Sequence, residues 1–395
     1  MSLVDNLIDA ALEKGGKTAN FSIVFPNGTS KKAGLGNDEF TIRIKSKEVY
    51  SQIINKGDLG LGEQYMLGNI DVEGDLAKAM LMAAQLGVNT YQKNLINTLI
   101  DGVISKTRSN SRHNSLKNVV HHYDLGNEFY EQWLDKTFTY SCAYFKDPSD
   151  TIDKAEEQKL EHICKKLQLK PGDSLVDVGC GWGSMLIYAA QKYKVKGYGL
   201  TLSKEQINYA TKKVKELGLE KLVIFEFKDY RDLTGEYDKF VSIGMFEHVG
   251  KKYYDQFFEK VKTILKAGGL GLLHTIGMNR GGSVGPWADT YIFPGGFLPS
   301  PTMIFDSATK SNLVPLDFEN LRYHYALTLH RWIEAYDNIF EKVAKEKGMS
   351  FARMWRIYLY SAEANFKAGN FQLYQLTFSN GNNNQLPLTR GYIYS

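Results

Sequence analysis

The stretch SLVDVGCGWGS, residues 174–184, decides the fold of this chain. Its first five residues are mostly apolar and predict a buried strand, and a helical pattern over Ser184–Tyr193 begins directly after the glycines. Glycines at such a turn let the backbone approach a ligand closely, and the N-terminus of the following helix offers unpaired N–H groups. The stretch therefore predicts a ligand-binding turn between a strand and a helix.

Alternating helices and strands flank this turn. A charged amphipathic helix is predicted at 153–167, and Ser203 is predicted to cap a further helix, with Gln206 as its capping-box partner. Helices of roughly 10–15 residues between short apolar strands are typical of βαβ units. We therefore expect an α/β fold with a doubly wound parallel sheet. Its further strands are predicted to end at Thr201 and to span Leu222–Phe227, Phe240–Ile243 and Leu270–Thr275.

A smaller α+β domain is predicted at 1–103, before a linker at 104–120 and a larger domain at 121–395. The smaller domain carries predicted helices at 3–12, 46–54 and 76–86, and predicted strands at 21–25 and 40–44. In the larger domain, Gly, Pro and aromatic residues interrupt the alternation at about 277–313, which is typical of a lid or binding loop. Helices at 327–347 and 351–366 and a strand at 372–378 are predicted to follow.

Composition excludes several classes of protein. The 395 residues favour two or three domains, and a net charge of +4 permits contact with anionic surfaces without requiring it. Three cysteines without C-x-x-C spacing argue against a disulfide framework and a zinc site. No apolar run is long enough to span a membrane, and acidic residues in the first helix argue against a signal peptide. We expect a cytoplasmic chain with no metal, no transmembrane segment and no nucleic-acid partner, which meets any lipid from the aqueous side.

The glycine spacing separates two cofactor classes. The NAD fingerprint is G-x-G-x-x-G, but here Ser184 stands at its third glycine. The observed G-x-G-x-G spacing, with Asp177 before it, resembles the S-adenosylmethionine site of class I methyltransferases. Residues 199–203 end the second strand, where a ribose would lie, and residues 229–231 follow the third, where an adenine would lie. The second strand lacks the usual ribose-binding carboxylate, and Gln206 could supply an amide instead.

A carboxylate and two imidazoles follow neighbouring strands. Glu247 and His248 come after the fourth strand, and His274 lies near the end of the fifth. Ligands of an open parallel sheet bind at the carboxyl ends of its strands, so we expect these side chains beside the cofactor methyl group. A carboxylate can also serve only the dipole of a helix, and a histidine can be bonded inside a core. At adjacent strand ends, however, they favour a proton-accepting site.

Five motifs in sequence order resemble the bacterial cyclopropane fatty acid synthase family, whose members act on phospholipids. They are HYDLGN (122–127), YSCAYF (140–145), GCGWG (179–183), MFEHVG (245–250) and YIFP (291–294). The resemblance covers about 121–379, and LGEQYM (61–66) is similar to an N-terminal domain that the mycolic-acid branch lacks. The resemblance to this family implies methylene transfer from S-adenosylmethionine to the cis double bond of unsaturated phospholipid acyl chains. The intermediate would be a carbocation that bound bicarbonate deprotonates.

The resemblance also implies site residues. The bicarbonate-binding positions, implied to be catalytic, are Cys142, Glu247, His274, Ile276 and Tyr325. The cofactor-binding positions are Tyr140, Ser141, Asp177, Gly179, Cys180, Gly181, Trp182, Gly183, Thr201, Gln206, Tyr230 and Arg231. The aromatic faces that could stabilise the cation are Phe246, Tyr291 and Phe293, with Tyr325. Family members often carry a cysteine where this chain has Glu363, which implies that the thiol is dispensable.

The resemblance further implies a homodimer associated peripherally with the inner face of the cell membrane. The apolar face of the predicted helix at 3–12 needs a partner, so we predict that the N-terminal domain serves lipid approach or dimerisation. Two other functions stay open. A nitrogen or oxygen methyltransferase for a small polar acceptor would not need the carboxylate–imidazole pair. A non-catalytic lipid-binding or dimerisation protein would not need the glycine turn, whose retention argues against that interpretation.

Overall fold

The computed structural model describes residues 3–87 and 125–394, which form two compact units. The sheet unit comprises 107–283, 295–328 and 371–395, and the N-terminal unit comprises 1–106, 284–294 and 329–370. The N-terminal unit thus contains two segments from the second half of the chain. The predicted linker at 104–120, the predicted boundary at 103 and the motif residues 122–124 lie outside the described residues.

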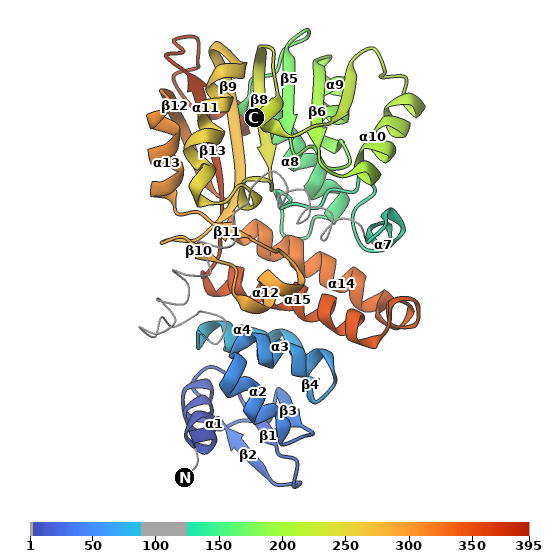
Figure 1. Ribbon diagram of the computed structural model, residues 1–395, viewed down its shortest axis with the longest axis vertical. Helices are drawn as coiled ribbons and strands as arrows, with labels where there is room; N and C mark the ends of the chain where they lie inside the picture. Colours follow the sequence, from blue (N-terminus) through green and yellow to red (C-terminus); the bar gives the residue numbers. More distant parts are fainter. Residues whose placement is uncertain (1–2, 88–124, 395) are drawn as a thin grey trace. The chain divides into compact units, whose positions relative to one another are not determined.

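A seven-stranded mixed sheet organises the sheet unit, in the order β12-β13-β9-β8-β5-β6-β7 (Figure 1). The strands from β5 to β9 run parallel, whereas β13 is antiparallel to both of its neighbours. The α/β fold is therefore confirmed, but the expectation of an all-parallel sheet is wrong at β13. Their bounds are β5 Ser174–Val178, β6 Lys196–Thr201, β7 Val223–Phe227, β8 Tyr237–Ile243, β9 Leu265–Gly277, β12 Leu313–Asn320 and β13 Gln372–Asn380.

Helices cover both faces of this sheet. On one face, α8 (Ile152–Lys166), α9 (Ser184–Tyr193) and α10 (Lys204–Glu216) contribute to one apolar core. On the other face, α11 (Tyr254–Ile264) and α13 (Pro301–Lys310) contribute to a second core. Successive residues of a strand point to opposite faces, so the central strands β5, β8 and β9 supply both cores. Side-chain oxygens of Thr151, Ser203 and Ser300 cap α8, α10 and α13.

The interval predicted to be irregular, at about 277–313, contains more regular structure than its Gly and Pro content indicates. It holds the strand pair β10 (Gly282–Ser283) and β11 (Phe297–Leu298), the short helix α12 (Pro286–Tyr291) and α13. The other short elements of the sheet unit, outside this interval, are α7 (Asn127–Glu131), η1 (Tyr230–Asp232), η2 (Phe246–His248), η3 (Lys251–Tyr253) and α16 (Gly391–Tyr394).

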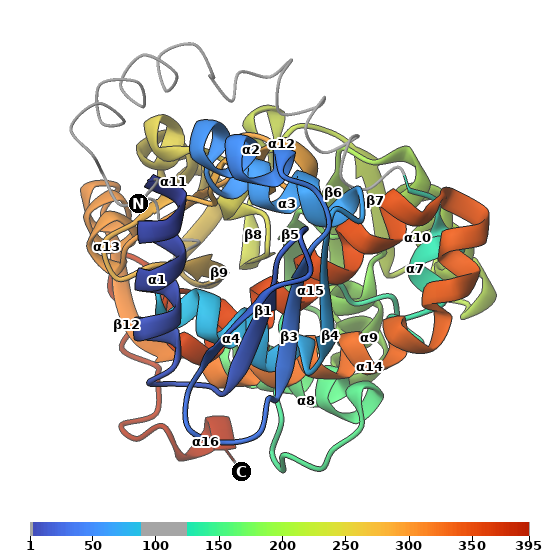
Figure 2. The ribbon, with the colours of Figure 1, turned by 90° about the horizontal axis from the view of Figure 1, so that it is seen from below.

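In the N-terminal unit, a four-stranded sheet has the order β2-β1-β3-β4, and Figure 2 shows β1, β3 and β4 side by side. The three predicted helices are found as α1, α2 and α4, and the two predicted strands as β1 and β3, but β2, α3 and β4 were not predicted. Their bounds are α1 Leu3–Gly15, β1 Phe21–Val24, β2 Ser30–Ala33, β3 Phe40–Ile44, α2 Glu48–Lys56, α3 Asp58–Met66, β4 Ile70–Gly74 and α4 Leu76–Gln85.

Helix α15 (Met349–Ala368) packs on α3 and α4 within the same unit, and α14 (Arg322–Lys347) precedes it. Arg353 of α15 lies 4.1 Å from the ring centre of Tyr65 and donates hydrogen bonds to the backbone oxygens of Tyr65 and Ile70. The Arg353 guanidinium therefore connects α15 to α3 and β4 by stacking and by hydrogen bonds. Among the described helices, none combines the length and the apolar character needed to cross a bilayer.

Candidate functional site

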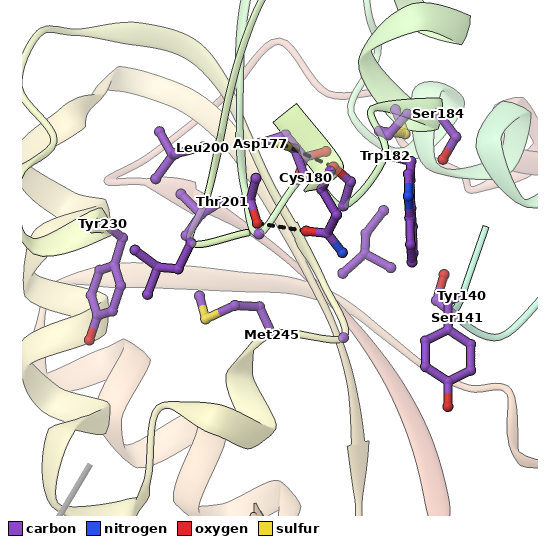
Figure 3. A pocket seen from close by; sticks show the side chains of 18 of the residues that line it. Tyr140, Ser141, Asp177, Cys180, Trp182, Ser184, Leu200, Thr201, Tyr230 and Met245 are labelled. Carbon is purple, nitrogen blue, oxygen red and sulfur yellow. Dashed lines mark hydrogen bonds between the residues drawn. The ribbon is translucent and has the colours of Figure 1, made fainter. Parts of the chain in front are cut away.

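A pocket opens around the turn between β5 and α9 (Figure 3). It is lined by residues at the ends of β5, β6 and β8, together with the segment before α8. Eleven of the twelve predicted cofactor positions line it, and the exception is Gly183. The structure therefore brings together side chains that lie as far apart in the sequence as Tyr140 and Arg231.

The three glycines of the turn serve different purposes. Gly179, Gly181 and Gly183 have φ values of 86°, 53° and 87°, a region that favours glycine. A Cβ atom on Gly179 would lie 2.7 Å from the Cβ atom of Met245, whereas one on Gly183 would lie 2.5 Å from the ring of Phe225. A Cβ atom on Gly181 would meet nothing within 4 Å. Gly181 thus leaves open space in the pocket, and Gly183 allows α9 to pack against the sheet.

Thr201 and Gln206 form the end of the pocket beside β6. The Thr201 hydroxyl donates a 2.7 Å hydrogen bond to the side-chain oxygen of Gln206, drawn dashed in Figure 3. Ser203 caps α10 as predicted, because its Oγ accepts from the backbone N–H of Gln206. The reciprocal half of the predicted capping box is wrong, since the Gln206 side chain turns to Thr201 instead. That bond orients the amide NH2 group of Gln206 away from Thr201.

Tyr230 and Arg231 lie at the adjoining end of the pocket, in η1. Arg231 pairs with Asp229, with Nη2 and Oδ2 2.6 Å apart, and its guanidinium carbon lies 5.5 Å from the ring centre of Tyr230. Burial raises the pKa of Tyr230 to about 12, so its hydroxyl stays protonated at neutral pH. This end offers an aromatic face next to a charged pair.

Aromatic rings form the opposite wall. The Trp182 indole N–H donates a 2.7 Å hydrogen bond to Asn127, and its ring lies 5.1 Å from that of Tyr130. Tyr140 packs against Tyr130 at 5.6 Å and against Trp133 at the same centroid distance. In Figure 3 the rings of Trp182 and Tyr140 lie near each other at one side of the pocket.

Buried charged residues, among them Lys159 and Asp177, line part of the pocket. The Lys159 ammonium is 2.8 Å from the Ser141 hydroxyl and 2.5 Å from the Glu156 carboxylate, and this last contact is an ion pair without hydrogen-bond alignment. Burial raises the pKa of Asp177 to about 7, opposed by Lys159, and its Oδ1 atom has no partner among the described residues. The sequence analysis missed Lys159. Its signal was available, because Glu156, Lys159 and Ile163 share the buried face of one helix.

Glu247 and His274 form a second group at the strand ends. Glu247 Oε1 accepts a 2.6 Å hydrogen bond from the Ile276 N–H group. Burial raises the pKa of Glu247 to about 7 and lowers that of His274 well below its usual value. Oε2 of Glu247 and Nε2 of His274 are buried and have no hydrogen-bond partner among the described residues. Buried polar atoms are normally satisfied, so each of these two atoms is a candidate contact for a small polar ligand.

Backbone contacts connect the remaining predicted bicarbonate positions to this group. Ile276 pairs with Leu373 of β13, whose carbonyl oxygen accepts from the Leu321 N–H at 2.8 Å. The Leu321 carbonyl accepts in turn from the Tyr325 N–H at 3.2 Å and lies 4.0 Å from the Cys142 thiol. These contacts link Glu247, Ile276, Tyr325 and Cys142 in succession within the sheet unit, and His274 lies two residues before Ile276 on β9. Burial raises the pKa of the Cys142 thiol well above its ordinary value, so that thiol is neutral.

Three of the four predicted cation-stabilising aromatics, Phe246, Tyr291 and Phe293, make packing or hydrogen-bond contacts with neighbouring side chains. Phe246 is fully buried in the core and stacks on Tyr254 at 4.2 Å, and it does not line the pocket. Tyr291 and Phe293 belong to the N-terminal unit. There the Tyr291 hydroxyl donates to Glu63 at 3.1 Å, and Phe293 packs against Tyr358. The contacts of Phe246 therefore favour a packing role for that residue.

Glu363 is also buried. It occupies the position where family members often carry a cysteine. Its Oε1 atom lies 2.7 Å from the Lys367 ammonium and 3.1 Å from Nδ1 of His330. All three residues belong to the N-terminal unit. The carboxylate therefore takes part in a local ion-pair group that a thiol could not reproduce.

Comparison with known proteins identifies the family. The family model described as mycolic acid cyclopropane synthetase matches residues 110–376, and a domain of unknown function matches 10–94. A cyclopropane-fatty-acyl-phospholipid synthase of Escherichia coli K12 is 37% identical over 369 residues, covering 92% of this chain and 95% of the relative. A probable fatty acid methyltransferase of Pseudomonas putida is 36% identical over 368 residues, covering 90% and 92%.

Solved structures agree with this result. The cyclopropane synthase MmaA2 from Mycobacterium tuberculosis is 31% identical with a TM-score of 0.64, over 67% of this chain and 98% of that one. The mycolic acid cyclopropane synthase CmaA1 complexed with SAH and CTAB is 34% identical with a TM-score of 0.63, over the same shares. The chain therefore belongs to the mycolic acid cyclopropane synthetase family and is an S-adenosylmethionine-dependent enzyme of the class I methyltransferase fold.

Proposed function

We propose that this enzyme transfers a methylene group from S-adenosylmethionine to the cis double bond of unsaturated phospholipid acyl chains. The observation that carries this proposal is the length of the match to the E. coli phospholipid-acting relative. It covers 92% of this chain and so includes N-terminal residues, whereas the solved mycolic-acid synthases cover only 67%. The substrate class of a relative that is matched along nearly its whole length is therefore a better guide than that of the shorter synthases.

The pocket residues suit S-adenosylmethionine as the methyl donor. The positive-φ glycines leave backbone room for the amino acid part of the cofactor, and the partnerless Oδ1 atom of Asp177 could accept from its amino group. The NH2 group of Gln206 could donate to a ribose hydroxyl in place of the missing carboxylate. Tyr230 and Arg231 suit an adenine ring, and the Trp182–Tyr140 wall excludes water near the reacting methyl group.

The group around Glu247 and His274 suits bicarbonate. A protonated Glu247 carboxyl, the Nε2–H group of His274 and the Tyr325 hydroxyl are donors suited to a small oxyanion. When bound, bicarbonate would supply the base that takes a proton from the newly added methyl group. The chain's own residues hold that base in a dry site, while a buried neutral thiol at Cys142 offers no competing nucleophile.

We also propose that the enzyme acts from the cytoplasmic side as a peripheral membrane protein and as a homodimer, with the N-terminal residues aiding lipid approach or dimerisation. The absence of a spanning helix among the described residues is compatible with this arrangement. Flotation of the full chain with anionic vesicles should carry it into the lipid fraction. Light scattering should give twice the monomer mass, and a monomer at all concentrations would refute the dimer.

The reaction is tested with S-adenosylmethionine that carries a trideuterated methyl group and vesicles of dioleoyl phospholipid. Attack of the double bond on the methyl carbon releases S-adenosylhomocysteine and leaves a cation on the acyl chain. Ring closure then removes one deuteron, so the cyclopropane product should retain two deuterium atoms. A product that retains all three would show methyl transfer without ring closure. Cofactor turnover with a polar acceptor and no label in lipid would refute lipid modification.

A further inference from the structure

Three strands of the sheet place three polar side chains in a line. In the register of β9 and β13, His274 stands directly opposite Gln375. In the register of β13 and β12, Gln375 stands directly opposite Glu319. Side chains of directly opposed residues emerge on the same face of a sheet, so the three form a polar row on the face covered by α8. His274 and Gln375 in this row are fully buried.

Lys166 of α8 sets the orientation of the Gln375 amide. Its buried ammonium lies 2.9 Å from Oε1 of Gln375 and 2.5 Å from Oε2 of Glu319. An ammonium group only donates hydrogen bonds, so the Gln375 atom that faces it must be the carbonyl oxygen. The other end of the amide, the Nε2 donor, then faces Nδ1 of His274 at 3.1 Å.

This orientation determines the tautomer of His274. An amide NH2 group has no acceptor lone pair, so Nδ1 of His274 must accept and cannot carry a hydrogen. Burial lowers the pKa of His274 well below its usual value, so the ring is neutral and its one hydrogen lies on Nε2. Nε2 is the buried atom that has no partner among the described residues. The polar row therefore leaves the ring with one N–H donor, at the ring nitrogen that Gln375 does not contact.

Glu319 and His162 keep Lys166 in place. Burial would raise the pKa of the Glu319 carboxyl, but hydrogen bonds and charge from His162 and Lys166 lower it to about 2, so Glu319 is anionic. Its Oε2 atom also lies 2.7 Å from Nε2 of His162. Asp317 adds a second carboxylate 3.6 Å from the Lys166 ammonium. The carboxylates of Glu319 and Asp317 thus balance the positive charge of Lys166, which orients the Gln375 amide. No group near Glu247 is needed for this balance.

We propose that Gln375 is a positioning residue that holds His274 as a neutral Nε2–H donor toward a small oxyanion, an inference that rests on the proposed bicarbonate role. The neutral state matters because an imidazolium would offer the anion an acidic proton and destroy the base. An Nδ1–H tautomer would instead turn a lone pair toward the anion and repel it. Only the tautomer set by Gln375 both binds the anion and preserves its basicity.

Nitrogen-15 spectroscopy of the histidine rings in the full-length protein tests the tautomer directly. The chain has 8 histidines, and His274 is assigned by the signals that the His274→Gln variant lacks. We expect a protonated Nε2 and an unprotonated Nδ1 in the wild-type protein at neutral pH. An Nδ1–H tautomer or an imidazolium would overturn the inference. Because no activity is measured, this result is independent of the proposed function.

The Gln375→Glu variant tests whether Gln375 is responsible. A carboxylate beside Lys166 only accepts, so it should draw the hydrogen to Nδ1 and invert the tautomer. The bicarbonate concentration for half-maximal activity should rise about tenfold or more, as for other residues that orient a ligand-binding histidine, with the KM for S-adenosylmethionine unchanged.

The matched control is Gln372→Glu, three residues away on β13 and therefore on its opposite face, which should keep the wild-type tautomer and bicarbonate response. An unchanged tautomer in Gln375→Glu, or equal effects of both variants on the bicarbonate response, would refute the positioning role. Wild-type activity that does not depend on bicarbonate would refute the proposed oxyanion role instead, while the tautomer measurement still decides the role of Gln375.

Discussion

The Lys159 ammonium, at the wall of the cofactor pocket, lies 2.5 Å from the Glu156 carboxylate, and both side chains are fully buried. The two residues are one helical turn apart on α8, so the helix itself holds the pair together. Burial raises the pKa of Glu156, and the neighbouring Lys159 ammonium opposes that shift. The pair places a fixed positive charge beside Ser141 and Asp177.

The Lys159→Met variant should lower the free energy of unfolding by about 3–5 kcal/mol, because it leaves the Glu156 carboxylate buried without its partner. Removing the carboxylate as well, in Lys159→Met with Glu156→Leu, should recover most of this loss. The control is Lys154→Met on the same helix, where an exposed ammonium pairs with Asp150 and the loss should stay within about 1 kcal/mol. Urea denaturation measures all three, and equal losses for Lys154 and Lys159 would contradict a special role of the buried pair.

The stability of the enzyme should depend on pH through Glu247. Burial raises its folded-state pKa to about 7 from an ordinary value of 4.5, so the folded protein binds a proton in this window that the unfolded chain has released. Stability from this group is therefore present below pH 4.5 and is lost as the pH rises to about 7, by up to about 3 kcal/mol. The Glu247→Gln variant should lose that part of the decline. Unfolding free energies that stay parallel in the two proteins between pH 4.5 and 7 would contradict the raised pKa.

Alanine at two glycines of the turn should separate packing from ligand binding. Both positions have positive φ, so either substitution costs about 1–3 kcal/mol of backbone strain. Gly183→Ala also drives a methyl group into the Phe225 ring, which should cost about 1–3 kcal/mol more, whereas Gly181→Ala meets no neighbour. Denaturation should rank Gly183→Ala as the less stable variant. Calorimetry should show that Gly181→Ala, whose methyl group enters the pocket, weakens S-adenosylmethionine binding more than its stability loss explains. The reverse order of stabilities would contradict this assignment.

The sequence predicts well those elements whose local pattern and environment agree. The predicted helix at 184–193 has the same bounds as α9. Its start could be predicted because the last glycine of the turn, Gly183, directly precedes a run of small and apolar residues. Helix α3 was missed, because its glycines at positions 60 and 62 have low helix propensity and are typical of loops. The direction of β13 was not predicted for another reason: the strand is buried along its whole length, and nothing in its own residues indicates whether it runs parallel or antiparallel to its neighbours.

The candidate site shows the same limit. Motifs could name the residues around Asp177 and Glu247, since local spacing and strand ends identify them. Gln375 and Lys166 could not be found in this way, because their importance depends on the register of three strands and on which helix covers that face. Register is a tertiary property, and a shift by one residue would turn Gln375 to the other face.

Within the N-terminal unit, Gly62 of α3 is in contact with Trp287 of α12. A Cβ atom on Gly62 would lie 2.2 Å from the indole ring, which is buried and donates its N–H group to the sulfur of Met66. The Gly62→Ala variant should displace the ring, cost about 1–3 kcal/mol of unfolding free energy and shift tryptophan emission to longer wavelength. Because the clash needs both partners, Trp287→Leu combined with Gly62→Ala should be more stable than the sum of the two single losses predicts. Strict additivity in this double-mutant cycle would show that the two helices do not meet at these residues.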